Sequence, residues 1–265
     1  MMDILHKAPP LPPFPHRLEG RIALVTGAAS GLGAAIAARL AGEGAIVWVA
    51  DIDEQGALAH AATLAGAQAI TLDVTSKEQW HSAIARIEAA HGRLDILVNN
   101  AGITTMGSIE TLDVEALRHE LEIDVIGVFL GCQSALPLMK KTGGSIVNMA
   151  SAAGLKADPG LVGYNAAKAA VTLMTKSIAL HCAKEKYGIR CNSVHPGAIH
   201  TPIIDKVLAQ VPNPEETLAG FLSVHPIGHL GHPDDIASIV AFLASDEARF
   251  ATGAAFSIDG GMTAL

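Results

Sequence analysis

The 265-residue sequence contains few cysteines, and their arrangement argues against a disulfide framework. Cys132, Cys182 and Cys191 are odd in number and lack the C-x-x-C spacing of thiolate metal sites. Cysteines of this kind are typical of a reducing compartment. The sequence therefore predicts neither disulfides nor a metal centre built on thiolates.

Positive charge is also scarce. The sequence has 18 Lys and Arg residues against 26 Asp and Glu residues, which gives a net charge of -8 without any basic cluster. Nucleic acids and anionic membranes are bound through clustered positive charge. We therefore expect no nucleic-acid partner and no membrane partner, and small molecules or further subunits are the expected partners.

Long hydrophobic runs are missing as well. No apolar run reaches the roughly 18 residues that a membrane-spanning helix requires. The opening segment MMDILHKAPPLPPFPHR lacks the apolar stretch of a signal peptide, so the predicted location is cytoplasmic. Five prolines between Pro9 and Pro15 disfavour a helix or a central strand. Residues 1–17 are expected to form an extended, proline-rich arm.

The sequence is rich in apolar residues, which make up 50% of it, against 17% charged residues. Short runs of Val, Ile and Leu alternate with longer helical segments, a pattern typical of a parallel sheet buried on both faces. The predicted fold is α/β: one doubly wound domain over residues 18–265, with about seven parallel strands flanked by helices. The strand candidates are residues 21–26, 45–51, 68–73, 94–99, 144–150, 189–195 and 254–261.

The segment around residues 200–227 interrupts this alternation. It contains four prolines among apolar residues such as Leu218 and Phe221. Proline breaks regular structure, and loops of this kind carry specificity. We expect a partly helical substrate lid, followed by a helix that Pro233 opens.

A glycine-rich turn, TGAASGLG, follows the first predicted strand. Gly27, Gly31 and Gly33 lack side chains, so backbone N–H groups can approach a pyrophosphate at a helix N-terminus. The spacing alone also fits a plain tight turn. Its position after the first strand favours dinucleotide binding.

Asp51 ends the second predicted strand, where an acidic residue can accept hydrogen bonds from the adenosine ribose. Its carboxylate would repel a 2′-phosphate. No Arg or Lys lies in the glycine turn or directly after Asp51 to bind such a phosphate. A solvated aspartate at a strand end is the alternative; otherwise the sequence predicts NAD rather than NADP.

A second chemical signal lies in SAAGLKADPGLVGYNAAK. Tyr164 and Lys168 are four residues apart on a predicted helix, so their side chains emerge on one face. A tyrosine has an ordinary pKa of about 10 and needs a nearby cation, such as a lysine ammonium, to act as a base near neutral pH. Ser151 follows a predicted strand and is expected at the edge of the sheet where α/β proteins bind ligands.

Together these motifs resemble the short-chain dehydrogenase/reductase family over nearly the whole chain after the arm. Segments such as YNAAKAAV are most similar to bacterial secondary-alcohol and hydroxysteroid dehydrogenases. The resemblance implies a Rossmann-like fold and a homotetramer paired through the helices that contain residues 111–139 and 162–187. Further motifs that carry the resemblance are DV at 73–74, NNAG at 99–102 and HPGAIHTP at 195–202.

The resemblance also implies an oxidoreductase that transfers a hydride between NAD(H) and a secondary alcohol or ketone, with a bulky, cyclic or steroid-like substrate expected. Ser151 would polarise the substrate oxygen, Tyr164 would exchange the proton, and Lys168 would assist the tyrosine and bind the nicotinamide ribose. The expected cofactor-binding residues are Gly27, Ser30, Gly31, Leu32, Gly33, Asp51, Ile52, Asp73, Val74, Asn100, Ala101, Gly102, Tyr164, Lys168, Pro196, Gly197, Ile199 and Thr201.

One position departs from the family pattern. The stretch EIDVIGVFLG carries Asp124 where the family has an asparagine as its fourth catalytic residue. In relatives, the backbone carbonyl of that asparagine holds a water linked to the lysine, and its side chain helps to fix a distortion in the helix. An ionised Asp124 near Lys168 would stabilise the ammonium and oppose a Tyr164 phenolate. The sequence thus predicts an active enzyme whose pH optimum for alcohol oxidation is shifted upward relative to an Asp124→Asn variant.

Two other residue groups invite a functional interpretation. Five histidines, at positions 195, 200, 225, 229 and 232, lack the helical H-x-x-x-H pair with a third ligand and are expected to line or flank the lid. Met106 and Leu155, with apolar lid residues, could form a hydrophobic pocket for a bulky or cyclic alcohol. Ordinary packing in the protein core is the alternative for each of them.

Two other functions stay open. A 3-oxoacyl thioester reductase would favour an NADPH site and a basic surface, and Asp51 and the acidic balance argue against both. A non-catalytic NAD-binding sensor would not need Ser151, Tyr164 and Lys168 together.

Overall fold

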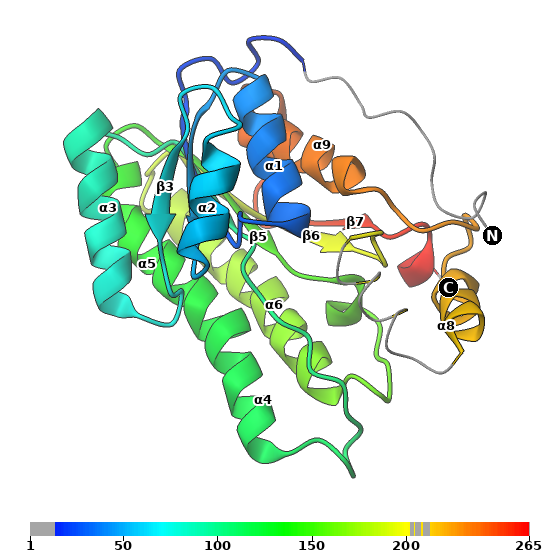
Figure 1. Ribbon diagram of the computed structural model, residues 1–265. Coiled ribbons are helices and arrows are strands. Elements are labelled where there is room, and N and C mark those ends of the chain that lie inside the picture. The colour runs from blue at the N-terminus through cyan, green and yellow to red at the C-terminus, as the bar shows by residue number, and fades with distance from the viewer. Residues whose placement is uncertain (1–13, 202–203, 205–207, 209–212, 265) are drawn as a thin grey trace.

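The computed structural model describes residues 14–201, 204, 208 and 213–264. Within these residues, seven parallel strands form one sheet in the order β3-β2-β1-β4-β5-β6-β7 (Figure 1). The predicted α/β fold with about seven parallel strands is confirmed. The strands are β1 Ile22–Thr26, β2 Ile46–Asp51, β3 Gln68–Thr71, β4 Ile96–Asn99, β5 Gly144–Met149, β6 Ile189–Pro196 and β7 Ala255–Ile258.

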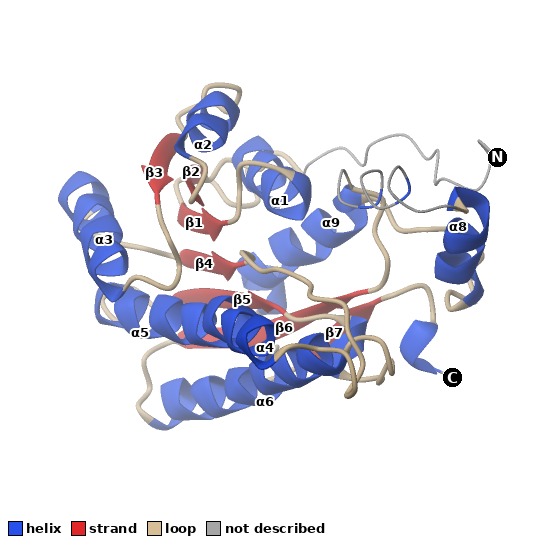
Figure 2. Ribbon diagram, turned by 60° about the horizontal axis from the view of Figure 1, so that its bottom comes forward, coloured by secondary structure: helices blue, strands red, loops and turns tan. Residues whose placement is uncertain are grey.

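Helices cover both faces of the sheet (Figure 2). One face carries α1 Gly31–Gly42, α2 Glu54–Ala61 and α9 Pro233–Ala244. The other carries α3 Lys77–His91, α4 Val114–Leu121, α5 Gly127–Met139 and α6 Val162–Lys184. Each face buries its own apolar cluster, because the alternate side chains of every strand point to opposite sides.

The strand order reverses between β1 and β4, which pair directly in parallel. Chain crossovers leave in opposite directions from this point, so a crevice opens above the carboxyl ends of the two strands. Asn99 at the end of β4 donates a hydrogen bond to Asn148 of β5 at 2.8 Å, and both side chains are buried. This polar contact fixes the register of the central strands below the crevice.

The helical run from Val114 to Met139 is interrupted by a π-helical turn, η1 Glu122–Ile126, which contains Asp124. An 18-residue window of the run has a mean hydropathy of 1.4, and the run is long and apolar enough to cross a membrane by length and composition. The expectation that no segment meets this criterion therefore does not hold. Core helices of soluble proteins pass the same test, and this one packs against α3, α6 and β4. We assign it to the core.

Two sequence-predicted segments are described only in part. Of the N-terminal arm, residues 14–17 are described: Phe14 is exposed, and Arg17 forms an ion pair with the buried Glu43 at 2.6 Å. Of the expected lid, the helix α8 Pro214–Ser223 is described. Residues 1–13, 202–203, 205–207 and 209–212 lie outside the described residues, and with them the lid positions Ile203 and Val207.

Candidate functional site

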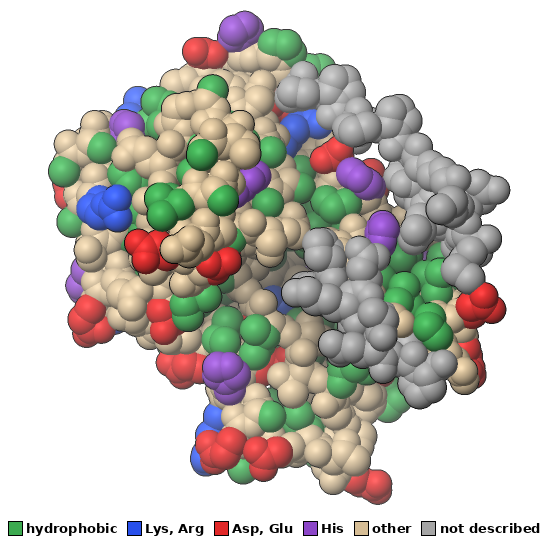
Figure 3. Space-filling model, in the orientation of Figure 1, with side chains coloured by type: hydrophobic (Ala, Val, Ile, Leu, Met, Phe, Trp, Pro, Cys, Tyr) green, Lys and Arg blue, Asp and Glu red, His purple; other side chains and the backbone are tan. Residues whose placement is uncertain are grey.

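A cleft of about 660 Å³ lies at the carboxyl ends of the strands, above the reversal of strand order. It opens on the face in Figure 3, where a hollow is visible near the centre. The turns after β1, β4 and β5 and the ends of β2 and β6 contribute to its walls. Every residue expected to bind a cofactor lines this cleft, as does Ser151.

The glycine turn closes tightly on itself at one wall of the cleft. Gly27 and Gly31 have φ angles of 63° and 57°, in the left-handed region that favours glycine. At Gly33, a β-carbon would lie 2.1 Å from the carbonyl oxygen of Gly27. The helix α1 begins at Gly31, so its free backbone N–H groups face the cleft. The turn and these N–H groups form a cradle that suits the charge of a pyrophosphate, and a side chain at Gly33 would push the turn away from α1.

The NNAG turn after β4 supports the glycine turn from the side. The Asn100 side chain donates hydrogen bonds to the carbonyl oxygens of Thr26 and Gly27 at 2.9 and 3.2 Å. The Thr26 hydroxyl accepts from the backbone N–H groups of Asn100 and Ala101. The two cofactor-facing turns are therefore held in one rigid unit.

The Asp51 carboxylate is oriented by backbone hydrogen bonds at the end of β2. Its Oδ2 accepts from the Ala29 N–H at 2.9 Å, and its Oδ1 accepts from the Asp53 N–H at 3.0 Å. Each oxygen has further lone pairs that can accept from a ribose hydroxyl. Asp53 and Glu54 follow directly, so the charge next to this wall is negative.

Ser151 begins the turn after β5, and a buried histidine holds its backbone. The His195 Nδ1–H donates to the Ser151 carbonyl oxygen at 2.9 Å, and His195 Nε2 accepts from the Ser193 hydroxyl at 2.8 Å. A carbonyl can only accept, so these contacts select one neutral tautomer. Burial lowers the pKa of His195, which favours the same neutral ring. His195 therefore fixes the position of Ser151.

Tyr164 and Lys168 line the cleft from α6, as their spacing predicts. The Lys168 Nζ lies 5.4 Å from the centre of the Tyr164 ring. It also donates to the Met149 carbonyl oxygen at 3.3 Å. Burial acts to lower the pKa of Lys168, but the negative charges of a Tyr164 phenolate and of Asp124 outweigh it, and the pKa is raised. The lysine is therefore a permanent cation beside the tyrosine.

Asp124 has an ionic partner and no contact with solvent. Its exposed fraction is 0%, and its Oδ2 lies 2.8 Å from the Lys168 Nζ. Its Oδ1 accepts from the Ile103 N–H at 2.8 Å. The π-helical turn places this carboxylate at the floor of the site, directly against Gly102. Asp124 does not line the cleft itself but contacts Lys168, which does.

Glu120 is a second buried carboxylate in this region, and sequence analysis did not identify it. Its exposed fraction is 0%, and its Oε1 accepts from the Thr105 N–H at 2.8 Å. In the sequence LRHELEID it looks like one more charged residue on an exposed helix face. Only its spacing of four residues from Asp124 could have signalled a shared face.

The histidines do not form a metal site among the described residues. The expectation that all five line or flank the lid is wrong for two of them. His195 lies in β6, beneath Ser151, because strand alternation turns it inward. His232 caps the N-terminus of α9. His225, next to the lid, is buried and accepts a hydrogen bond from the Ala198 N–H.

The three cysteines are buried, whereas the two residues expected in an apolar pocket are exposed. All three cysteines are free and buried, and burial raises the pKa of Cys132 to about 12, so its thiol stays protonated. Met106 and Leu155 are exposed, and neither is among the described residues that line the cleft.

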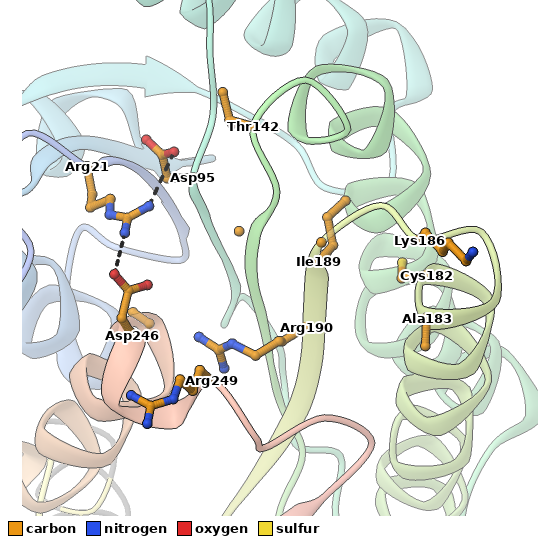
Figure 4. A pocket seen from close by; sticks show the side chains of 13 residues that line it. Arg21, Asp95, Thr142, Cys182, Ala183, Lys186, Ile189, Arg190, Asp246 and Arg249 are labelled. Atoms are coloured by element: carbon orange, nitrogen blue, oxygen red, sulfur yellow. Dashed lines mark hydrogen bonds and ion pairs between the residues drawn. The ribbon is translucent and has the colours of Figure 1, made fainter.

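A second cavity, of about 670 Å³, lies at the opposite edge of the sheet, where the strands begin (Figure 4). Arg21 there bridges Asp95 and Asp246. Arg190 donates to the carbonyl oxygens of Leu243 and Ser245. These guanidinium groups are engaged by the protein itself, and none of the candidate catalytic residues lies near them.

Comparisons with known proteins agree with this geometry. A family model described as "Enoyl-(Acyl carrier protein) reductase" matches residues 27–263. The chain is 41% identical to the NADP-dependent (R)-specific alcohol dehydrogenase of Lentilactobacillus kefiri, over 94% of this chain and 98% of that protein. It is 40% identical to the 3-beta-hydroxysteroid dehydrogenase of Comamonas testosteroni, over 92% and 96%.

A solved structure from Burkholderia xenovorans, described as a short-chain dehydrogenase/reductase, has the same fold. It superimposes with a TM-score of 0.89 at 38% identity, over 94% of this chain and 99% of that one.

The close contact between Gly33 and the Gly27 carbonyl oxygen predicts how a side chain at position 33 changes the stability of the protein. Gly33→Ala should destabilise the protein by about 2 kcal/mol, because the new methyl group would overlap the Gly27 carbonyl. Gly220→Ala in α8 is the control, since a β-carbon there meets nothing within 4 Å and should stabilise the helix by about 0.5–1 kcal/mol. Chemical denaturation measures both. A Gly33→Ala protein as stable as the wild type would contradict the close contact.

Proposed function

The chain belongs to the short-chain dehydrogenase/reductase family, and from this premise we propose that it oxidises a secondary alcohol to a ketone with NAD, or runs the reverse reduction. The observation that carries the proposal is the presence of Ser151, Tyr164 and Lys168 in one cleft with the glycine cradle. A sensor or scaffold would have no need of a buried lysine cation beside a tyrosine.

The catalytic roles follow from the positions of the side chains. The Ser151 hydroxyl donates a hydrogen bond to the substrate oxygen and fixes it near Tyr164. The Tyr164 phenolate takes the hydroxyl proton from the alcohol as the carbonyl forms. The Lys168 ammonium stabilises the phenolate through its positive charge. A nicotinamide, when bound, accepts the hydride from the substrate carbon.

The cofactor is held along the walls of the cleft. The N-terminus of α1 and the glycine turn receive the pyrophosphate, Asp51 accepts from the adenosine ribose, and Asp73 lies where the adenine binds. Ile199 and Thr201, at the far wall, hold the nicotinamide carboxamide. Residues 18–265 form the catalytic domain, and residues 200–227 form its substrate lid.

We also propose that the protein is a cytoplasmic homotetramer. Ile126 and Phe129 on the run that ends with α5, and Leu173 and Leu180 on α6, are large apolar side chains exposed to solvent. Exposed apolar side chains on neighbouring helices are typical of subunit interfaces. Sedimentation of the protein as a monomer would contradict this part of the proposal.

The activity is tested by mixing the protein with NAD and a panel of secondary alcohols, including cyclic alcohols and hydroxysteroids, and following NADH by its absorbance. We expect turnover of bulky or cyclic alcohols, and its loss by about 100-fold or more in Tyr164→Phe, which cannot accept the proton. Binding of NAD without turnover of any alcohol would favour the sensor. Reduction of a 3-oxoacyl thioester by NADPH, with no alcohol oxidised by NAD, would favour the thioester reductase.

The cofactor preference is tested at Asp51. One relative is NADP-dependent by name, whereas the acidic wall of this cleft favours NAD. Asp51→Asn should lower kcat/KM for NAD by about 10-fold, because a charge-assisted hydrogen bond is lost. It should raise kcat/KM for NADP, because the charge that repels the 2′-phosphate is removed. Glu54→Gln removes the same charge from an exposed neighbour and should leave both values near those of the wild type. A wild type that prefers NADP would overturn the assignment.

The role of Asp124 is tested by the pH dependence of alcohol oxidation. The negative charge of Asp124 stabilises the Lys168 ammonium and opposes the Tyr164 phenolate. In Asp124→Asn this charge is gone, so the phenolate forms at lower pH. The rise of the rate with pH should therefore start at lower pH in the variant than in the wild type. Coincident profiles would contradict the electrostatic effect of Asp124.

A further inference from the structure

The buried Glu120 has no role in the proposed hydride transfer. This carboxyl lies four residues before Asp124 on the same helical run, and no part of it reaches solvent. One oxygen, Oε1, accepts from the Thr105 N–H at 2.8 Å. The other, Oε2, has no hydrogen-bond partner among the described residues. A buried carboxylate oxygen without a partner is costly when it is ionised.

The surroundings of Glu120 Oε2 are backbone and leucine methyl groups. A β-carbon built on Gly163 of α6 would lie 2.5 Å from this oxygen, 3.0 Å from a methyl of Leu112 and 3.2 Å from a methyl of Leu117. The oxygen therefore faces an apolar contact between α4 and α6. Burial raises the pKa of Glu120, and the Asp124 charge adds to this effect. The Thr105 hydrogen bond and the Lys168 charge act in the opposite direction, but the pKa remains raised.

Few charged groups face Glu120. Asp124 lies on its own helical run, and Lys168 approaches from α6, with Tyr164 beside Lys168. Arg118, on the same run, is exposed and pairs with Glu115. Two buried carboxyl groups therefore share one ammonium. If both are ionised, the net charge behind Tyr164 is negative and opposes a phenolate; one proton on Glu120 removes this excess.

We propose that Glu120 is a positioning residue that sets the net charge of the Asp124–Lys168 pair through the proton that its buried carboxyl takes up and releases. When it is ionised, it strengthens the hold on the Lys168 proton and opposes the Tyr164 phenolate. The same carboxyl holds Thr105, next to the cleft residues Ile103 and Thr104. This role rests on the proposed function, because its effect is measured through the ionisation of Tyr164 during alcohol oxidation.

The test compares pH profiles of alcohol oxidation in Glu120→Gln and Glu122→Gln. A glutamine at 120 still accepts from the Thr105 N–H but cannot ionise. We expect its rate to rise with pH about one pH unit earlier than that of the wild type, while the KM for the alcohol changes less than about twofold. Glu122→Gln is the matched control, on the exposed face of the same run, and should follow the wild type.

A purely structural role of Glu120 would change KM or stability and leave the profile in place. Coincident profiles of Glu120→Gln and the wild type would therefore overturn the proposal. If Glu120→Gln does not fold, infrared difference spectra of the wild type provide the test. A protonated-carboxyl band that persists to higher pH than that of an ordinary glutamate is expected, and no such band would overturn the proposal.

The infrared measurement needs no substrate, so it separates the two hypotheses. A protein that shows the band and oxidises no alcohol would contradict the proposed function while supporting the proton on Glu120. A protein that oxidises alcohols and lacks the band would support the function and contradict the role of Glu120.

Discussion

The ion pair between Asp124 and Lys168 joins three parts of the fold that the chain builds separately. Asp124 lies in the π-helical turn between α4 and α5, and Lys168 lies in α6. Asp124 also accepts a hydrogen bond from the N–H of Ile103, which lies in the turn after β4. Ile103 and Lys168 line the cleft, and Asp124 lies beneath them. Removing one partner of such a buried pair costs about 3–5 kcal/mol, because the other charge is left uncompensated. The geometry of the site therefore depends on this pair.

The same pair also limits the chemistry of Tyr164. A lysine cation promotes a phenolate, and a carboxylate beside that lysine weakens the effect. In the proposed reaction, catalysis is thus a balance between one buried ammonium and the carboxyl groups behind it, Asp124 and Glu120. His195 contributes a second rigid contact from β6, by holding the Ser151 backbone as a neutral ring. Tyr164 and Ser151 are both positioned by buried residues that never reach the substrate.

Much of this arrangement could be predicted from the sequence, because it follows from local patterns. Apolar runs located the strands within a few residues, and positions directly after strands located the cleft, since parallel strands end at one edge. Contacts between distant segments could not be predicted. Glu120 meets Thr105 and Gly163 only through the packing of α4 on α6, and His195 meets Ser151 only through the pairing of β5 and β6. From the sequence, the Asp124 carboxylate could be expected either to face water or to have a partner. Only the fold identifies that partner as Lys168.

The central claim, that Asp124 and Lys168 stabilise the fold as a buried pair, is tested most directly by a double-mutant cycle. The free energies of unfolding of the wild type, Asp124→Asn, Lys168→Met and the double variant would be compared at one pH and protein concentration. The account predicts that the double variant is more stable than the sum of the single effects allows, with a coupling of about 1 kcal/mol or more. Additive single effects would contradict it.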